Sequence, residues 1–110
     1  MKVEQKGNST IVKDTQANAE AFLMKLTHEH KTFEKQNLIL DITADKTVSL
    51  KTISQFKSLS KIHRKGKKSF VIVADGIDFT QVPDALVVVP TVLEAHDLIE
   101  MDEIERDLGF

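Results

Sequence analysis

Short runs of aliphatic and β-branched residues alternate along this chain with longer segments in which apolar residues recur at helical spacing. The short runs predict strands at residues 2–6, 10–12, 38–42, 70–74 and 86–89. Gly7 and Asn8 separate the first two runs by a tight turn, so we expect these runs to pair as a hairpin. Crossover connections separate the last three runs, which indicates parallel strands. The pattern predicts an α/β domain, a mixed sheet with mainly parallel core strands, covering helices and an N-terminal β-hairpin.

An amphipathic segment lies between the second and third predicted strands. Asp14 and Thr15 are N-cap candidates for this helix, which is expected to run to about Glu34. Its inward positions follow helical spacing, and they are Phe22, Leu23, Leu26, His30 and Phe33.

A second amphipathic segment follows the third predicted strand. It is expected to begin at Ser49, whose hydroxyl should accept a hydrogen bond from the amide of Lys51 or Thr52. Gly66 is expected to end it. Its apolar residues recur at every third position, at Leu50, Ile53, Phe56, Leu59 and Ile62. Together with the strand pattern this predicts buried positions that include Leu40, Ile53, Phe56, Val71 and Val73.

The last helical segment changes its apolar face partway along. It is expected to begin at Thr91, with Glu94 at the spacing of a capping box. One face carries Val92, Ala95 and Ile99, and the opposite face carries Met101, Ile104 and Leu108. Because a straight helix cannot bury both sets against one neighbour, we predict a kink near residues 101–102. A short final helix, capped by Asp102 and ended by Gly109, would follow the kink.

This division predicts a domain over residues 1–100 and an acidic amphipathic tail over residues 101–110. The tail either belongs to the same domain or is a separate docking element. Its docking residues would be Met101, Ile104, Leu108 and Phe110. Docking on its own domain, with the acids above the basic end of the second long helix, is the favoured interpretation. Docking in the groove of a partner protein is the alternative.

Composition removes several classes of chemistry. The chain of 110 residues has the length of one domain and contains no cysteine, which excludes disulfides, thiolate metal sites and a thiol nucleophile. Trp and Tyr are absent, so the usual stacking residues of sugar and single-stranded nucleic-acid sites are missing. No stretch has the roughly 20 apolar residues of a membrane helix, and the N-terminus lacks the apolar block of a signal peptide. We therefore expect a cytoplasmic protein without membrane association.

The net charge of -2 conceals an uneven distribution. Residues 46–68 contain eight Lys or Arg and no acid, whereas residues 91–110 contain seven Asp or Glu and one Arg. The simplest interpretation of these charged segments is that they are solvated helix faces. The more specific interpretation is that they are partner-binding surfaces. The basic patch comprises Lys61, Arg64, Lys65, Lys67 and Lys68. It leaves open a nucleotide or nucleic-acid binder, although a nucleic-acid site would be expected to include stacking aromatic residues or a known motif.

The middle of the chain resembles a known family. Asn37 to Ile42 is the predicted strand, a polar loop follows, and the next helix ends Lys61-Ile62-His63-Arg64-Lys65-Gly66 before the strand Phe70-Val71-Ile72-Val73. This order resembles the STAS domain, the fold of bacterial anti-sigma factor antagonists and of transporter tails, over most of the chain. The resemblance implies a STAS-like fold and a non-catalytic regulatory module that binds a partner protein. The acidic ending is similar to that of small Bacteroidetes proteins that sometimes carry a ribonuclease Z label.

The same resemblance implies a site at the loop before the second long helix. In the switch members of the family, a partner kinase phosphorylates a serine at the start of this helix, which releases the antagonist. Asp45 corresponds to the aspartate of the family motif, Lys46 and Thr47 follow it, and Ser49 is the hydroxyl at the helix start. Ser49 and Thr47 are therefore the phosphorylation candidates. The partner-binding surface comprises Asp45, Lys46, Thr47, Ser49 and Lys51, and the partner would be a kinase, a regulator or an enzyme encoded nearby.

No cofactor, metal site or catalytic residue is predicted. His28 and His30 suggest a metal, because metal-dependent ribonucleases bind two ions through clustered histidines and carboxylates. On a helix these two residues point about 200° apart. Thr32 stands where such a cluster would need an aspartate. A metal-dependent ribonuclease is therefore the least favoured alternative, and we expect no enzymatic activity.

Overall fold

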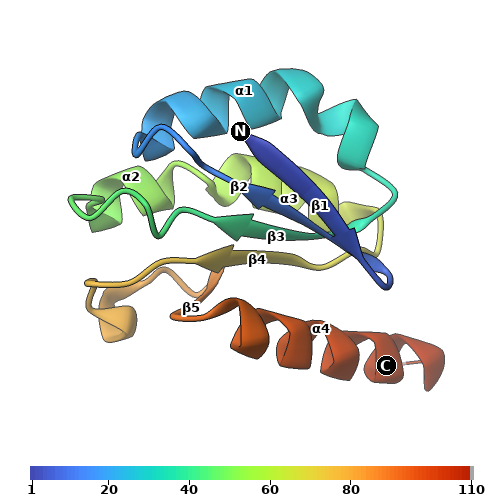
Figure 1. The fold of residues 1–110 in the computed structure, drawn as a ribbon. Helices are drawn as coiled ribbons and strands as arrows, with labels where there is room; N and C mark the ends of the chain where they lie inside the picture. Colours follow the sequence, from blue (N-terminus) through green and yellow to red (C-terminus); the bar gives the residue numbers. More distant parts are fainter. Residues whose placement is uncertain (110) are drawn as a thin grey trace.

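A computed structural model describes residues 1–109, and Phe110 lies outside the described residues. Its centre is a five-stranded sheet with the strand order β1-β2-β3-β4-β5 (Figure 1). β1 pairs with β2 antiparallel, and the pairs from β2 to β5 are parallel. The strands are β1 Lys2–Lys6, β2 Ser9–Lys13, β3 Asn37–Asp41, β4 Phe70–Val73 and β5 Val87–Val89. The predicted α/β class, the edge hairpin and the mainly parallel core are confirmed.

Helices cover both faces of the sheet (Figure 1). One face is covered by α1 Ala19–Phe33, α2 Leu50–Ser54 and α3 Lys57–Lys65, whereas α4 Val92–Asp107 covers the other. A short 3-10 helix, η1 Phe79–Gln81, lies in the connection from β4 to β5. β3 and β4 are buried along their whole length, as expected for central strands between two helix layers. The predicted core positions are all buried, namely Leu40, Ile53, Phe56, Val71 and Val73.

The first helix begins later than the sequence suggested. Its N-cap is Asn18, whose side chain accepts a hydrogen bond from the Ala21 amide, so the prediction of Asp14 or Thr15 is wrong. The Asp14 carboxylate is buried and accepts from the amides of Gln16 and Asn18. It therefore holds residues 14–18 as a loop instead of starting the helix.

The segment from Ser49 to Gly66 contains two helices instead of one. The amides of Gln55 and Phe56 bond to carbonyls three residues back, which tightens the chain between α2 and α3. The spacing of three residues between the apolar positions also has a consequence for their burial. A three-residue step drifts about 60° around an α-helix, so Ile62 at the end of the predicted stripe is 59% exposed. His63 takes the inward place next to it.

The last helix is continuous, and the predicted kink is wrong. Thr91 caps α4 and accepts from the Glu94 amide, as the capping-box spacing predicted. The inward face begins with Val92, Ala95 and Ile99 and continues with Asp102, Glu103 and Arg106. These polar side chains find partners at the start of β3 and β4, so the helix has no reason to break.

Asn37 is the centre of the polar contacts that hold the end of α4. Its side chain is fully buried, and its Nδ2 donates to the Asn8 carbonyl oxygen and to Glu103 Oε1 at 3.2 and 2.6 Å. Its Oδ1 accepts from the Ser69 amide at 2.9 Å and from Arg106 at 3.3 Å. All of the hydrogen-bonding capacity of this side chain is thus used, which explains how a buried amide is tolerated at the first residue of the central strand β3. Hydrogen bonds from Asn37 and Arg106 lower the pKa of the Glu103 carboxyl.

Candidate functional site

The loop between β3 and α2 lies at the carboxyl edge of the parallel strands, where α/β folds usually place binding sites (Figure 1). Asp45 organises this loop. Its Oδ2 accepts from the Ala19 amide at the start of α1 at 3.0 Å. Its Oδ1 accepts from the Thr47 amide and hydroxyl at 3.1 and 3.0 Å. The hydrogen bond from the Ala19 amide is the main cause of the lowered pKa of the Asp45 carboxyl.

Two further contacts fix the ends of the loop. Lys46 forms an ion pair with Asp75 in the next loop, with 3.1 Å between Nζ and Oδ2. Both side chains are well exposed, so we expect this pair to contribute less than about 1 kcal/mol. Ser49 caps α2, and its hydroxyl accepts from the Thr52 amide at 3.2 Å, which confirms the predicted cap. The loop is therefore ordered by its own side chains.

The predicted partner-binding residues share this ordered surface. Lys46, Thr47, Ser49 and Lys51 are exposed, and Asp45 is half-buried beneath them. The Thr47 hydroxyl donates to Asp45, whereas the Ser49 hydroxyl keeps its proton available for another acceptor, because it accepts the cap hydrogen bond. The Thr52 hydroxyl, at 3.2 Å, is one such acceptor. The two phosphorylation candidates therefore differ: the Thr47 hydroxyl donates to the Asp45 carboxylate, and the Ser49 hydroxyl does not.

Ser49→Ala should lower the free energy of unfolding by about 1 kcal/mol, because the Thr52 amide loses its cap. Urea unfolding followed by circular dichroism measures this loss. Ser58→Ala is the matched control, since Ser58 is exposed on the first turn of α3. Equal stability of the two variants would show that the cap contributes nothing.

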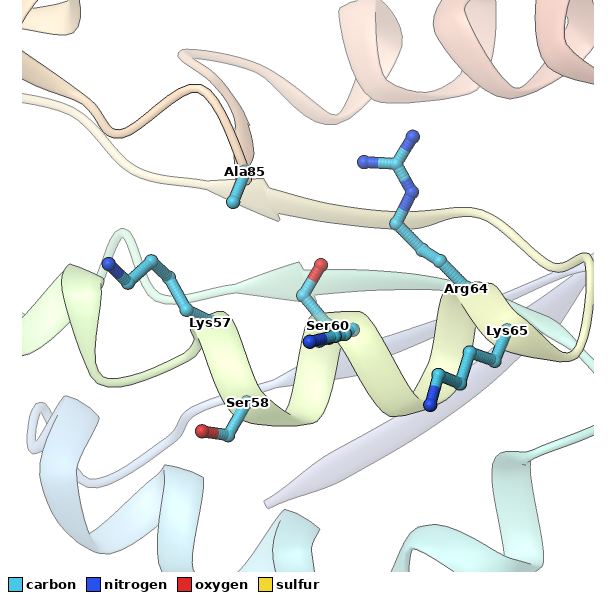
Figure 2. A pocket seen from close by; sticks show the side chains of 7 residues that line it. Lys57, Ser58, Ser60, Arg64, Lys65 and Ala85 are labelled. Atoms are coloured by element: carbon cyan, nitrogen blue, oxygen red, sulfur yellow. The ribbon is translucent and has the colours of Figure 1, made fainter.

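The five residues of the predicted basic patch line two hollows that share Arg64. Lys61, Arg64 and Lys65 line a groove along α3 together with Lys57 and Ala85 (Figure 2). Lys67 and Lys68 line a different hollow, which Arg64 borders as well. That second hollow also contains the α4 acids Asp102 and Glu105. The expectation that tail acids lie near the basic end of the second long helix agrees with this arrangement.

The outward face of α4 leaves large apolar side chains in solvent. Met101, Ile104 and Leu108 are 58%, 58% and 65% exposed, so the favoured interpretation that they dock on their own domain is wrong. The fourth predicted docking residue, Phe110, lies outside the described residues. Leu93, which is absent from the predicted docking residues, is also exposed, at 72%. Its spacing of eight residues from Met101 was the signal that could have revealed it.

The two histidines considered as metal ligands have different surroundings. His28 is exposed, whereas His30 Nε2 lies 2.9 Å from Nδ1 of the buried His63. His63 Nε2 lies 2.7 Å from the Gln36 carbonyl oxygen, which only accepts, so this nitrogen must hold a proton. His63 Nδ1 therefore accepts from His30 when His63 is neutral. Within residues 1–109, no three His, Asp or Glu side chains are placed to hold a metal ion.

Burial lowers the pKa of His63 below its usual 6.5, although the hydrogen bond to Gln36 opposes this shift. The facing groups are His30 on α1, Glu34 after it and Lys68 before β4. Because the folded pKa is lowered, the unfolded chain binds the proton first as the pH falls below about 6.5. His63 should therefore stabilise the fold fully above this pH and progressively less below it.

Melting temperatures measured at about pH 8 and about pH 5.5 test this dependence. The drop at the lower pH should be smaller in His63→Gln than in the unchanged protein. His28→Gln, which alters an exposed histidine on α1, should keep the full drop. An undiminished drop in His63→Gln would contradict the assignment.

No protein-family model matches this chain, and a search of curated proteins finds no match either. Across the part of the chain that the structure describes, no helix is long and apolar enough to cross a membrane. The fold, a five-stranded mixed sheet between helices, is compatible with the STAS-like arrangement that the sequence suggested.

Proposed function

We propose that this chain is a non-catalytic, cytoplasmic regulatory module of the STAS type that binds a partner protein. The observation that carries the proposal is the row of apolar side chains on the outward face of α4. Leu93, Met101, Ile104 and Leu108 are all more than half exposed on one helix. Contiguous exposed apolar side chains on a monomer mark interaction sites.

The spacing of this row suits a helical partner. The residues on this face of α4 follow one another at steps of four, four, three and four positions. They are Leu93, Asp97, Met101, Ile104 and Leu108. Such alternation keeps one seam facing a neighbouring helix or an apolar groove. We define these five residues as the α4 seam.

Charge around the α4 seam indicates the chemistry of the partner. Glu94, Glu100, Glu105 and Asp107 are exposed acids on the same helix, and Asp97 lies within the seam itself. Two copies of α4 packed against each other would bring acids close to acids, which is unfavourable. A basic amphipathic helix of another protein would instead pair its charges with these acids while it covers the apolar row.

The basic side of α3 in a second copy is a poor alternative partner. α3 and α4 cover opposite faces of the sheet (Figure 1). Contact between α4 of one copy and α3 of the next would be heterologous, so it continues as an open chain unless the rotation between the copies closes a ring. A different protein closes the complex, which favours a heteromeric partner.

Ile104→Glu tests the α4 seam, with Ile62→Glu as the matched control. The two isoleucines are 58% and 59% exposed and lie on opposite helix layers. Affinity purification from native extract identifies the partner, and calorimetry with the isolated partner measures affinity. Ile104→Glu should weaken binding at least tenfold, because burying one large aliphatic side chain is worth roughly 1.5–3 kcal/mol. Equal affinity of both variants would rule out the α4 seam as the contact.

The loop before α2 would supply the switch in this proposal. Phosphorylation of Ser49 adds a charge of about -1.5 to -2 to an ordered, exposed surface that contains Lys46 and Lys51. A kinase or regulator bound to this surface would lose its contacts. Mass spectrometry after incubation with native extract and ATP should find phosphate on Ser49, with Thr47 as the second candidate. Exclusive labelling of other residues would remove the switch and leave the α4 seam proposal standing.

A further inference from the structure

A groove of about 590 Å³ runs along α3, beside the loop that leads into β5 (Figure 2). Its lining residues are Lys57, Ser58, Ser60, Lys61, Arg64, Lys65 and Ala85. This volume falls within the range of small-ligand sites. The groove lies on the helix layer opposite α4, so it is separate from the α4 seam.

Ser60 forms the floor of this groove and has an unsatisfied hydroxyl. The residue is 1% exposed, and no described residue forms a hydrogen bond with its Oγ. In Figure 2 the Ser60 hydroxyl extends from α3 on the side that faces Ala85. Buried polar groups usually have partners, and one without a partner destabilises the fold. A ligand atom in the groove would provide the missing acceptor.

Cationic side chains line the groove together with Ser60, and no acid lines it. Lys57, Lys61 and Arg64 recur at steps of four and three residues, which places them along one side of α3. Within residues 1–109 none of them forms an ion pair. The aliphatic stems of the lysines and the Ala85 methyl group supply apolar walls. The groove thus combines a positive rim, an apolar wall and one buried donor.

We propose that this groove binds a small amphipathic organic anion, namely an aliphatic chain with a carboxylate or phosphate head group. The head group accepts from the Ser60 hydroxyl and from the Arg64 guanidinium, whose planar donors suit both kinds of anion. Lys57 and Lys61 neutralise the remaining charge, and the aliphatic chain lies against their stems and Ala85. A nucleic acid fits less well, since no aromatic side chain lines the groove for stacking.

Binding is measured by NMR of the full chain labelled with ¹⁵N. Four probes are added separately: octanoate, octyl phosphate, 1-octanol and inorganic phosphate. Octanoate or octyl phosphate should shift the amide signals of Ser60 and Ala85 in a saturable manner. Octanol and inorganic phosphate should bind much more weakly, because each lacks one half of the recognition. Whichever of the two octyl anions binds more tightly identifies the head group.

Ser60→Ala and Arg64→Gln should each weaken binding of the preferred octyl anion about tenfold, since each removes a hydrogen bond to a charged group. Lys51→Gln is the matched control, because Lys51 is an exposed cation on α2 outside the groove. Thermal melts of each variant establish that it is folded. Three results would each overturn the site. They are an equal weakening of binding by Lys51→Gln, unchanged binding in Ser60→Ala, and the absence of a saturable shift with either octyl anion. Shifts at Ser60 and Ala85 that an acidic peptide produces and neither octyl anion does would instead assign the groove to a macromolecule.

Discussion

Phe56→Ala is expected to lower the free energy of unfolding by about 3–5 kcal/mol, the largest effect that we predict for this protein. Phe56 is fully buried at the tightened turn between α2 and α3, where its ring packs in the core between these helices and the sheet. Truncation leaves a cavity that close-packed neighbours fill only in part. Urea unfolding monitored by circular dichroism measures the loss.

Ile62→Ala is the control for this prediction. Phe56 and Ile62 belong to the same every-third-residue pattern, yet Ile62 is 59% exposed. Its truncation should change stability by no more than about 0.5 kcal/mol. If both substitutions cost the same, α3 is rotated relative to the arrangement described here, and Ser60 and the groove along α3 would move with it.

Asn37→Ala is the second substitution with a large expected effect, about 2–4 kcal/mol. It removes four hydrogen bonds at a fully buried position. The Ser69 amide, Glu103 and Arg106 would each lose a partner at the amino ends of β3 and β4. An unsatisfied buried group costs about 1–3 kcal/mol. The total loss of stability is limited, because Glu103 and Arg106 also form an ion pair with each other at 2.9 Å.

The residues that lose hydrogen-exchange protection in Asn37→Ala distinguish a loosened α4 from a general weakening of the sheet. Hydrogen exchange in Asn37→Ala should accelerate most at residues 101–107, because the end of α4 is held by this network. Asn8→Ala is the control, since Asn8 contributes only its backbone carbonyl to Asn37. Uniform acceleration over all strands in Asn37→Ala would contradict the assignment of Asn37 to α4.

The sequence predicted the sheet well because its strands have strong local signals. β4 is a continuous apolar run, and β3 contains the apolar run Leu38-Ile39-Leu40. Gly7, whose φ is 64°, lies in the turn of the β1–β2 hairpin. The Ser49 and Thr91 caps were also predictable, since a cap depends on residues within three positions. These features need no knowledge of the rest of the fold.

The errors arose where distant residues decide the local conformation. The apolar pattern predicted a kink in α4, but Asn37 and Ser69, more than thirty residues away in sequence, satisfy its polar inward face. Asp14 was a reasonable N-cap by type, but its amide donates to the Asp41 carbonyl oxygen at the end of β3, and its buried carboxylate accepts from the loop amides of Gln16 and Asn18. The groove along α3 involves Ala85, which no pattern around residues 57–65 connects to that helix.

The strand order has a consequence for how the protein is made. Each strand pairs with the strand that precedes it in sequence, so the sheet can lengthen by one strand at a time as the chain leaves the ribosome. α4 comes last, yet it alone covers the second face, where Ile39, Val71 and Val73 would otherwise meet water. The bond between Asn37 and Glu103 spans 66 residues. Until α4 has left the ribosome, the nascent chain therefore exposes an aliphatic sheet surface. Aggregation or binding to a chaperone would compete with folding during this interval.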